Sequence, residues 1–171
     1  NKIDKTIIQS INTAVNLNKQ LTQTSTTEIQ INSGNLNAKI KYATPLLSKF
    51  HHLKQLSLRH IQATDKDVAK PLADFLKTNP PLKRLVLAFN QLSNLGLRYL
   101  SKNMASNTHL TTLDLSHNYI VLDEKSCSER AQVFAKNKAL GSVDLTGNFL
   151  QEDCDALFAP LPMFNQQQPQ V

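Results

Sequence analysis

The sequence predicts an α/β solenoid, a stack of units that each contain a strand, a turn and a helix. The first observation is a pattern, seen in residues 110–120 (LTTLDLSHNYI), in which Leu110, Leu113 and Leu115 are followed by Asn118. The second observation is that copies of this pattern begin about 27 to 30 residues apart. A fixed period of this length is typical of repeat proteins, in which each unit packs only against its neighbours.

Four further segments match the pattern in full or in part, and they begin at Thr26, Leu53, Leu82 and Leu140. The copy that begins at Leu82 matches at every position, and its asparagine is Asn90. The last copy has Val143 in place of the second leucine and keeps Asn148. The two earliest copies depart at the asparagine position, which is occupied by Gly34 in one and by Ile61 in the other.

The pattern resembles that of leucine-rich repeat proteins, and within them the long-repeat subclass typified by ribonuclease inhibitor. The unit that follows Asn90 carries the resemblance best, because it continues with Gly96, Leu100 and Met104 at the spacing of the helical half of such a repeat. The resemblance implies a horseshoe arc of about five repeats, with a parallel sheet on the concave side and helices on the convex side.

The chain divides into three predicted parts. Residues 1–25 carry isoleucines at helical spacing and are expected to form a capping helix or part of an upstream repeat. Residues 26–164 are expected to hold the repeats and a C-terminal cap, and the polar residues 165–171 a disordered tail.

Helices are predicted within each repeat, near residues 38–50, 65–78, 94–106 and 124–137, with a short terminal helix at 152–159. Pro71 is unfavourable inside a helix, so the stretch before it is predicted to be irregular and the regular helix to begin near Pro71. Pro80 and Pro81 are expected to end that helix.

Composition narrows the function. The net charge is +6, but the lysines are scattered and no basic run contains interleaved aromatic residues, so a solvated basic surface is favoured over nucleic-acid binding. No apolar run approaches the roughly 20 residues of a membrane helix. A monomer is expected, located in the cytoplasm or delivered by bacteria into a host cytosol.

Cys127 and Cys154 lie at similar points of successive repeats. Two buried thiols are the favoured interpretation, and a disulfide and a metal site remain alternatives, although the spacing fits no compact zinc-ligand set. The chain has no cysteine-rich caps and no glycosylation sequon, which favours a reducing compartment.

No catalytic motif is present. The chain lacks G-x-x-x-x-G-K, H-E-x-x-H and G-x-S-x-G patterns. The adjacent His51 and His52 are interpreted as a solvated pair. Asp114, Asp144, His60 and His117 are interpreted as surface polar residues, because nothing supplies an activated nucleophile with an orienting base. We therefore expect no enzymatic activity, no metal and no cofactor.

A partner-binding surface is predicted on the concave sheet, where residues that alternate with the leucines align in columns across parallel strands. The columns are Glu28, Gln55, Arg84, Thr112 and Ser142; Gln30, Ser57, Val86, Asp114 and Asp144; Asn32, Arg59, Ala88, Ser116 and Thr146; and, just past the strands, Ser33, His60, Phe89, His117 and Gly147.

These columns change sign along the stack. The second and third repeats are made basic by Lys54, Arg59, Lys83 and Arg84, whereas Asp114 and Asp144 make the later repeats more acidic. Val86, Ala88 and Phe89 are expected to form an apolar patch between them, although Phe89 has the alternative of turning inward against the turn. The predicted partner-binding residues are Arg59, His60, Arg84, Val86, Phe89, Asp114, His117 and Asp144.

The predicted function is non-catalytic protein binding through the concave face. An alternative is the substrate-recognition part of a larger enzyme, such as a ubiquitin ligase whose catalytic domain lies outside this chain. Abundant lysine, asparagine, glutamine and isoleucine, without tryptophan, resemble effectors that intracellular bacterial pathogens deliver into host cells. A eukaryotic cytosolic regulator is an alternative.

Asn90, Asn118 and Asn148 are predicted to stack as a ladder in which each amide bonds the backbone of its own turn and of a neighbouring turn. Gly34 and Ile61 interrupt this ladder, so the N-terminal end is expected to be looser and Ile61 to fill core space. Asn118 has ladder neighbours on both sides, so its loss is expected to cost more stability than the loss of Asn148.

Overall fold

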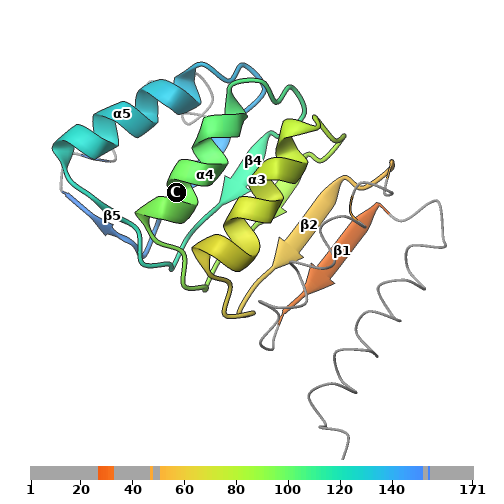
Figure 1. Cartoon of the computed structure of the whole chain (residues 1–171), viewed down its shortest axis with the longest axis horizontal. Coiled ribbons are helices and arrows are strands. Elements are labelled where there is room, and N and C mark those ends of the chain that lie inside the picture. The colour runs from red at the N-terminus through yellow and green to blue at the C-terminus, as the bar shows by residue number, and fades with distance from the viewer. Residues whose placement is uncertain (1–26, 33–46, 48–50, 152–153, 155–171) are drawn as a thin grey trace, which may run out of the picture.

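The computed structural model describes residues 27–32, 47, 51–151 and 154. Within them, five strands form one parallel sheet in the order in which they occur along the chain (Figure 1). They are β1 (Glu28–Ile31), β2 (Gln55–Leu58), β3 (Arg84–Val86), β4 (Thr112–Asp114) and β6 (Ser142–Asp144). The predicted α/β class with a parallel sheet is confirmed.

The sheet register repeats one apolar row in every strand. Ile29, Leu56, Leu85, Leu113 and Val143 pair across the sheet and are at most 5% exposed. The residues before and after them in each strand point to the opposite face, as the twofold alternation of a strand requires. The pairing therefore confirms the first two predicted columns residue by residue.

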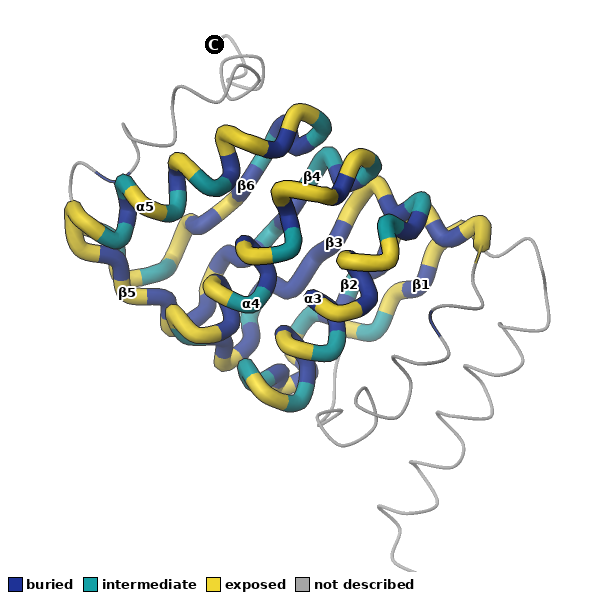
Figure 2. Tube along the Cα trace, turned by 45° about the horizontal axis from the view of Figure 1, so that its top comes forward, coloured by how far each residue is buried: buried dark blue, intermediate teal, exposed yellow. Residues whose placement is uncertain are grey.

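Helices cover one face of this sheet (Figure 2). They are η1 (Asp65–Ala69), α3 (Lys70–Lys77), α4 (Asn94–Met104) and α5 (Glu124–Ala135). As predicted, the segment before Pro71 is irregular, a single π-helical stretch, and Pro71 lies in the first turn of the regular helix, where proline is tolerated.

A carboxylate from one repeat fixes the start of the next helix. Asp65 accepts hydrogen bonds from the backbone N–H of Ser93 at 2.9 Å and from its hydroxyl at 2.5 Å, and Ser93 caps α4. A Cβ at Gly96 would overlap the Asp65 carboxylate, so glycine is what allows η1 and α4 to approach this closely.

The predicted strand-end asparagine ladder is also confirmed. Asn118 accepts from the backbone N–H of Leu92 at 3.0 Å and donates to the carbonyls of Leu87 and Leu115, at 3.0 and 2.9 Å. Asn90 also donates to Leu87 O, and Asn148 also donates to Leu115 O. The three amides are therefore linked through shared carbonyls into one chain.

Ile61, which replaces an asparagine of the ladder, is fully buried in the core, as predicted. Its turn is held from the next repeat, because the side-chain oxygen of Asn90 accepts from the backbone N–H groups of Ile61 and Ala63, each at 3.0 Å. Asn90 thus serves two donors, whereas the side-chain oxygen of Asn118 serves one backbone donor.

A second set of asparagines, absent from the predictions, lies where helices return to strands. The side-chain oxygen of Asn107 accepts from the N–H groups of His109 and Leu110, and that of Asn137 accepts from Ala139 and Leu140. Their amide groups donate to carbonyls of the preceding repeat, Leu76 for Asn107 and Met104 and Asn107 for Asn137. Both side chains are buried.

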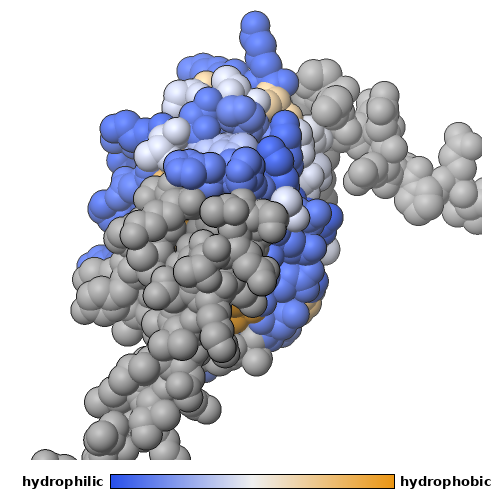
Figure 3. All heavy atoms as spheres, turned by 90° about the vertical axis from the view of Figure 1, so that its right-hand side faces the viewer, coloured by the Kyte–Doolittle hydropathy of each residue, from blue (hydrophilic) through white to orange (hydrophobic). Residues whose placement is uncertain are grey.

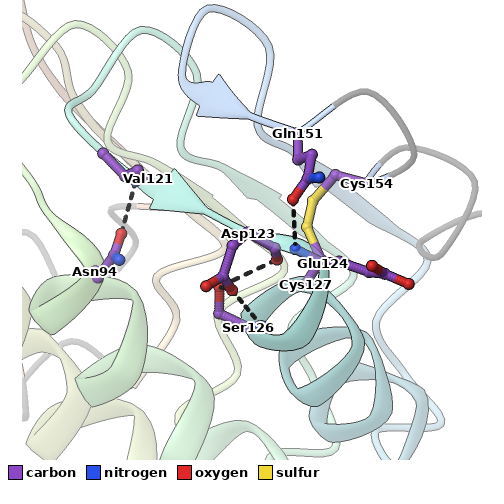
Figure 4. Close-up of a disulfide and its surroundings, with 8 residues drawn as sticks. All are labelled: Asn94, Val121, Asp123, Glu124, Ser126, Cys127, Gln151 and Cys154. Atoms are coloured by element: carbon purple, nitrogen blue, oxygen red, sulfur yellow. Dashed lines mark hydrogen bonds between the residues drawn. A yellow bond between two sulfur atoms is a disulfide. The ribbon is translucent and has the colours of Figure 1, made fainter.

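The last described repeat is closed covalently. Cys127, on α5, forms a disulfide with Cys154, and both residues are buried (Figure 4). The expectation of two free thiols is therefore wrong. The cysteines are 27 residues apart, which is one repeat, so they occupy adjacent positions in the stack. The bond also removes cysteine usage as an argument for a reducing compartment.

Beside this disulfide, β5 (Val121–Leu122) and β7 (Phe149–Leu150) form a small second parallel sheet, and Gln151 accepts from the N–H of Glu124 at 2.9 Å. The predicted capping helix in residues 1–25, the tail 165–171 and almost all of the predicted helices 38–50 and 152–159 lie outside the described residues. Among the described helices, none combines the length and apolar character needed to cross a membrane.

Candidate functional site

The candidate site lies on the face of the sheet that carries none of the described helices, which we call the open face. The strand ladder continues beyond the assigned strands, because Arg59 N–H donates to Ile31 O, Phe89 N–H to Ser116 O and His117 N–H to Thr146 O. The described residues of the predicted columns past the strands, Arg59, Phe89 and His117 among them, therefore also lie side by side.

A hollow of about 540 Å³ opens over β1, β2 and β3. Its lining includes Glu28, Ser57, Arg59, His60, Arg84 and Val86. Four of the predicted partner-binding residues, Arg59, His60, Arg84 and Val86, therefore meet in one depression. Seen from the β1 edge of the sheet, the described atoms that grey residues leave visible are mostly hydrophilic (Figure 3).

The two arginines of the hollow are held differently. Arg84 is exposed and forms no ion pair with any described residue. The Arg59 guanidinium carbon lies 5.4 Å from the centre of the Phe89 ring, a cation–π distance. The carboxylate of Glu28, at the β1 edge, accepts a hydrogen bond from the Gln30 side chain. Positive charge therefore prevails at the β2 and β3 part of the hollow.

A stack of three rings borders this region. The Phe89 ring centre lies 4.5 Å from that of His60 and 4.2 Å from that of His117, with interplanar angles of 20° and 9°. Phe89 is half-buried between the two imidazoles, so it does not turn inward into the core. The ring stack consists of residues with left-handed backbone, at φ 50°, 58° and 53° for His60, Phe89 and His117.

Gly147 ends the ring stack. Its φ is +73°, and a Cβ at this position would overlap the His117 imidazole. Glycine suits both conditions, because a side chain here would strain the left-handed backbone and would displace the His117 ring. The stack is therefore confined to the repeats that carry His60, Phe89 and His117.

The predicted apolar patch beside these rings is not accessible. Val86 is 4% exposed and Ala88 is fully buried. Both are short and lie between positions with longer side chains, those of Arg84 and Phe89, which leaves them little contact with solvent. Of the three apolar residues in the predicted patch, Phe89 alone has a substantial exposed area.

The two aspartates of the later repeats hold strand ends. Asp114 accepts from the N–H of Ser116 at 3.0 Å and from its hydroxyl at 2.6 Å, and Asp144 accepts from the N–H of Thr146 at 2.9 Å. Such bonds to the backbone two residues ahead stabilise turns. Asp114 is half-buried and directs its bonds to Ser116 rather than to His117. Negative charge nonetheless remains on this half of the face.

One described side chain, Asp123, has a shifted pKa, and it lies at the start of α5, away from the open face. The hydroxyl and the N–H of Ser126 both donate to Asp123, and they hold the pKa of this carboxyl below its ordinary value. Asp123 caps α5 (Figure 4). Within the described ranges, no group of three or more His, Cys, Asp or Glu side chains is arranged to hold a metal ion.

The sequence prediction missed that Gln55 and Ser57 line the hollow together with the arginines. A signal was present, because both residues occupy the predicted columns beside Arg84 and Val86. They were passed over because neutral polar side chains carry no charge or ring to single them out.

Comparisons with known proteins agree with this architecture. Residues 78–101 and 106–120 match the family described as Leucine Rich repeat. No curated protein matches the sequence at a significant level.

Several solved structures share the fold, including the following two. One is the tropomodulin C-terminal domain of Caenorhabditis elegans, at a TM-score of 0.70 and 15% identity, covering 84% of this chain and 89% of that one. The other is described as leiomodin-1 actin-binding site 2, at a TM-score of 0.62 and 20% identity, covering 84% of this chain and 85% of that one. At these identities the likeness concerns the fold alone.

Proposed function

Because this chain contains leucine-rich repeats that build a parallel sheet with an open face, we propose that it is a protein-binding module that takes its partner on that face. The observation that carries the proposal is the hollow over β1 to β3, in which Arg84 has no ionic partner among the described residues and Arg59 rests on an aromatic ring. Arginine and aromatic side chains are frequent anchors at protein interfaces.

A non-catalytic role fits the residues that could carry chemistry. Asp114 and Asp144 accept bonds from strand-end backbone, and His60 and His117 stack on Phe89. The contacts of these side chains stabilise the strand ends and the ring stack of the face. The proposed function therefore uses the face as a rigid surface rather than as a reactive site.

The repeats support a placement in the long, ribonuclease-inhibitor-like subclass, since each described helix from α3 to α5 fills the second half of a unit of about 27 to 30 residues. A horseshoe arc would follow from that placement. The two solved structures named above are neither bacterial effectors nor ligases, so those two expectations from the sequence gain no support from them.

Actin is the first defined partner to test, because the leiomodin-1 structure with this fold is described as an actin-binding site. The experiment compares the wild-type chain with the double variant Arg59→Glu, Arg84→Glu in co-sedimentation with filamentous actin and in capture of partners from a cell lysate. A matched control is Lys102→Glu, Lys136→Glu, which reverses two exposed charges beside the helices.

We expect the double-arginine variant to lose at least about tenfold in affinity for the captured partner, with the lysine variant unchanged. Circular dichroism of all three chains verifies that the fold is kept. Equal partner binding by the wild type and the double-arginine variant would contradict the open-face proposal.

A further inference from the structure

We infer that the hollow over β1 to β3 receives an extended acidic segment of the partner, whose two carboxylates, four residues apart, meet Arg84 and Arg59. This inference rests on the proposed function, because it specifies the chemistry of the partner for the same face. It also restricts binding to the basic half of the face.

Charge is the first argument. Four cationic residues lie on β2 and β3 or at their ends, namely Lys54, Arg59, Lys83 and Arg84. None of them forms an ion pair in the part of the chain that the structure describes, where the two ion pairs present join Lys70 to Asp74 and Arg130 to Glu129. Arg59 and Arg84, the two of these cations that line the hollow, are therefore available to a partner, and they outnumber Glu28, the one carboxylate of the lining.

Spacing is the second argument. Arg84 pairs with Gln55 across the sheet, and Arg59 lies four residues after Gln55. At about 3.3 Å per residue, the two arginine positions are about 13 Å apart along the strand direction. In an extended segment, residues i and i+4 point to the same side and are also about 13 Å apart. Helical residues at i and i+4 are only about 6 Å apart and fit this spacing less well.

Direction is the third argument. A segment that crossed the sheet toward β4 and β6 would bring its carboxylates to Asp114 and Asp144, which keep negative charge on that half. Like charges at close range disfavour such a complex. A segment that runs along β2 and β3 meets both arginines, stays away from Asp144, and approaches Asp114 only beside Val86, which pairs with it across the sheet.

Preorganisation is the fourth argument. The Arg59 guanidinium lies over Phe89, and Phe89 is held between His60 and His117. A side chain that is already positioned loses less conformational freedom when a ligand binds. Ser57 lies between the arginines along the strand direction, and Gln55 lies beside Arg84, its partner across the sheet. Both supply polar groups for the backbone of an extended ligand.

The test is an NMR titration of the ¹⁵N-labelled chain with three synthetic peptides of equal length, built from glycine, serine and two variable positions. The first peptide carries glutamates at i and i+4, the second carries them at i and i+1, and the third carries glutamines at i and i+4. We expect the first peptide to shift the amides of Ser57 and Val86 and to bind about tenfold more tightly than the third.

The variant Arg84→Gln should remove most of the preference for glutamate, whereas Lys136→Gln on the far side of the molecule should leave it unchanged. Equal affinity for the first and third peptides would overturn the acidic character of the ligand. Equal affinity for the first and second would overturn the extended geometry. Tighter binding of an oligothymidylate through the same amides would assign the hollow to phosphate instead.

The two proposals fail separately. If a captured protein partner depends on Arg59 and Arg84 but no acidic peptide prefers the wild-type hollow, the acidic-segment inference is wrong and the protein-binding function stands. If the partner is insensitive to the double-arginine variant, the open-face function is wrong as well.

Discussion

Asparagines connect the repeats at both ends of the strands, and the two sets work differently. At the strand exits, Asn90, Asn118 and Asn148 share the carbonyls of Leu87 and Leu115, so an acceptor that loses one amide keeps another. At the helix exits, Asn107 and Asn137 each bond two N–H groups of their own turn and reach back to the preceding repeat.

We infer that the stability lost with an asparagine depends on the backbone N–H groups left without a partner, rather than on the carbonyls. A buried N–H that loses its partner costs about 1–3 kcal/mol, whereas a carbonyl with a second donor remains satisfied. The number of N–H groups that depend on one side-chain oxygen therefore ranks the positions, and the substitutions below test that ranking.

The largest effect is expected for Asn90→Ala. Its side-chain oxygen is the partner of the N–H groups of both Ile61 and Ala63, which lie in the buried turn that lacks its own asparagine. We expect a loss of about 4 kcal/mol in the free energy of unfolding, measured by urea denaturation. The exposed neighbour Gln91→Ala is the control, and equal midpoints for the two variants would break the ranking.

The Cys127–Cys154 disulfide is expected to stabilise the C-terminal end, beyond the last asparagine of the ladder. Removing it with Cys127→Ala, Cys154→Ala opens a loop of 27 residues and should cost about 3.5 kcal/mol in the free energy of unfolding. Urea denaturation of the oxidised wild type and of the variant measures this difference. Two thiols that react in the unfolded wild type without reductant would show that the bond is absent.

Asn107→Ala compares the helix-exit set with the strand-exit ladder directly. Two N–H groups, of His109 and Leu110, lose their partner, but the His109 turn is only half-buried, so we expect a loss of about 3 kcal/mol by urea denaturation. The control is Asn103→Ala, which removes one bond to Ala73 O from a half-buried helical position and should cost under about 1 kcal/mol. A smaller loss for Asn107 than for Asn103 would show that this set contributes little.

Within the strand-exit ladder, Asn118→Ala should cost about 2 kcal/mol and Asn148→Ala about 1 kcal/mol. Each removes the partner of one N–H, that of Leu92 or of Ile120, but Asn148 is half-buried and water can replace part of its bonding. Parallel thermal melts measure the order. The reverse order would mean that shared carbonyls, which flank Asn118 on both sides, protect it more than we infer.

The smallest effect concerns the cap of α5 and its dependence on pH. The folded pKa of Asp123 is lowered by the Ser126 hydroxyl and N–H, so its contribution to stability is present above the ordinary aspartate pKa and is lost as the pH falls through the lowered folded value. Asp123→Ala should therefore melt slightly lower than the wild type at pH 6, with the difference shrinking as the pH falls below the ordinary aspartate pKa. Asp123→Asn, which caps without titrating, should show no such pH dependence.

Much of the fold could be predicted because the leucine spacing fixes both the strand register and the asparagine positions. Leu113 and Asn118, for example, occupy the places that the pattern requires. The helix-exit asparagines were missed although Asn79, Asn107 and Asn137 each precede a pattern leucine by three residues. A helix end can be satisfied in several ways, so an asparagine there is less diagnostic than one at a strand exit.

The sequence predicted which residues of the candidate site align across the strands, but not which of them are exposed. Register follows from the period, so Arg59, Arg84 and the ring positions were placed correctly. Exposure depends on the lengths of neighbouring side chains, which is why Val86 and Ala88 proved buried. The Cys127–Cys154 bond could not be distinguished from two thiols, because spacing by one repeat brings cysteines together without specifying their oxidation state.

The backward reach of the ladder has a consequence for synthesis on the ribosome. The N–H of Leu92 donates to Asn118, which is translated 26 residues later. The N–H of Ile120 donates to Asn148, which is translated 28 residues later. A nascent chain therefore cannot complete one turn until the following repeat has left the exit tunnel. We expect the repeats to mature from the N-terminus with a lag of one unit, so that an arrested chain always carries one unfinished turn at its growing end.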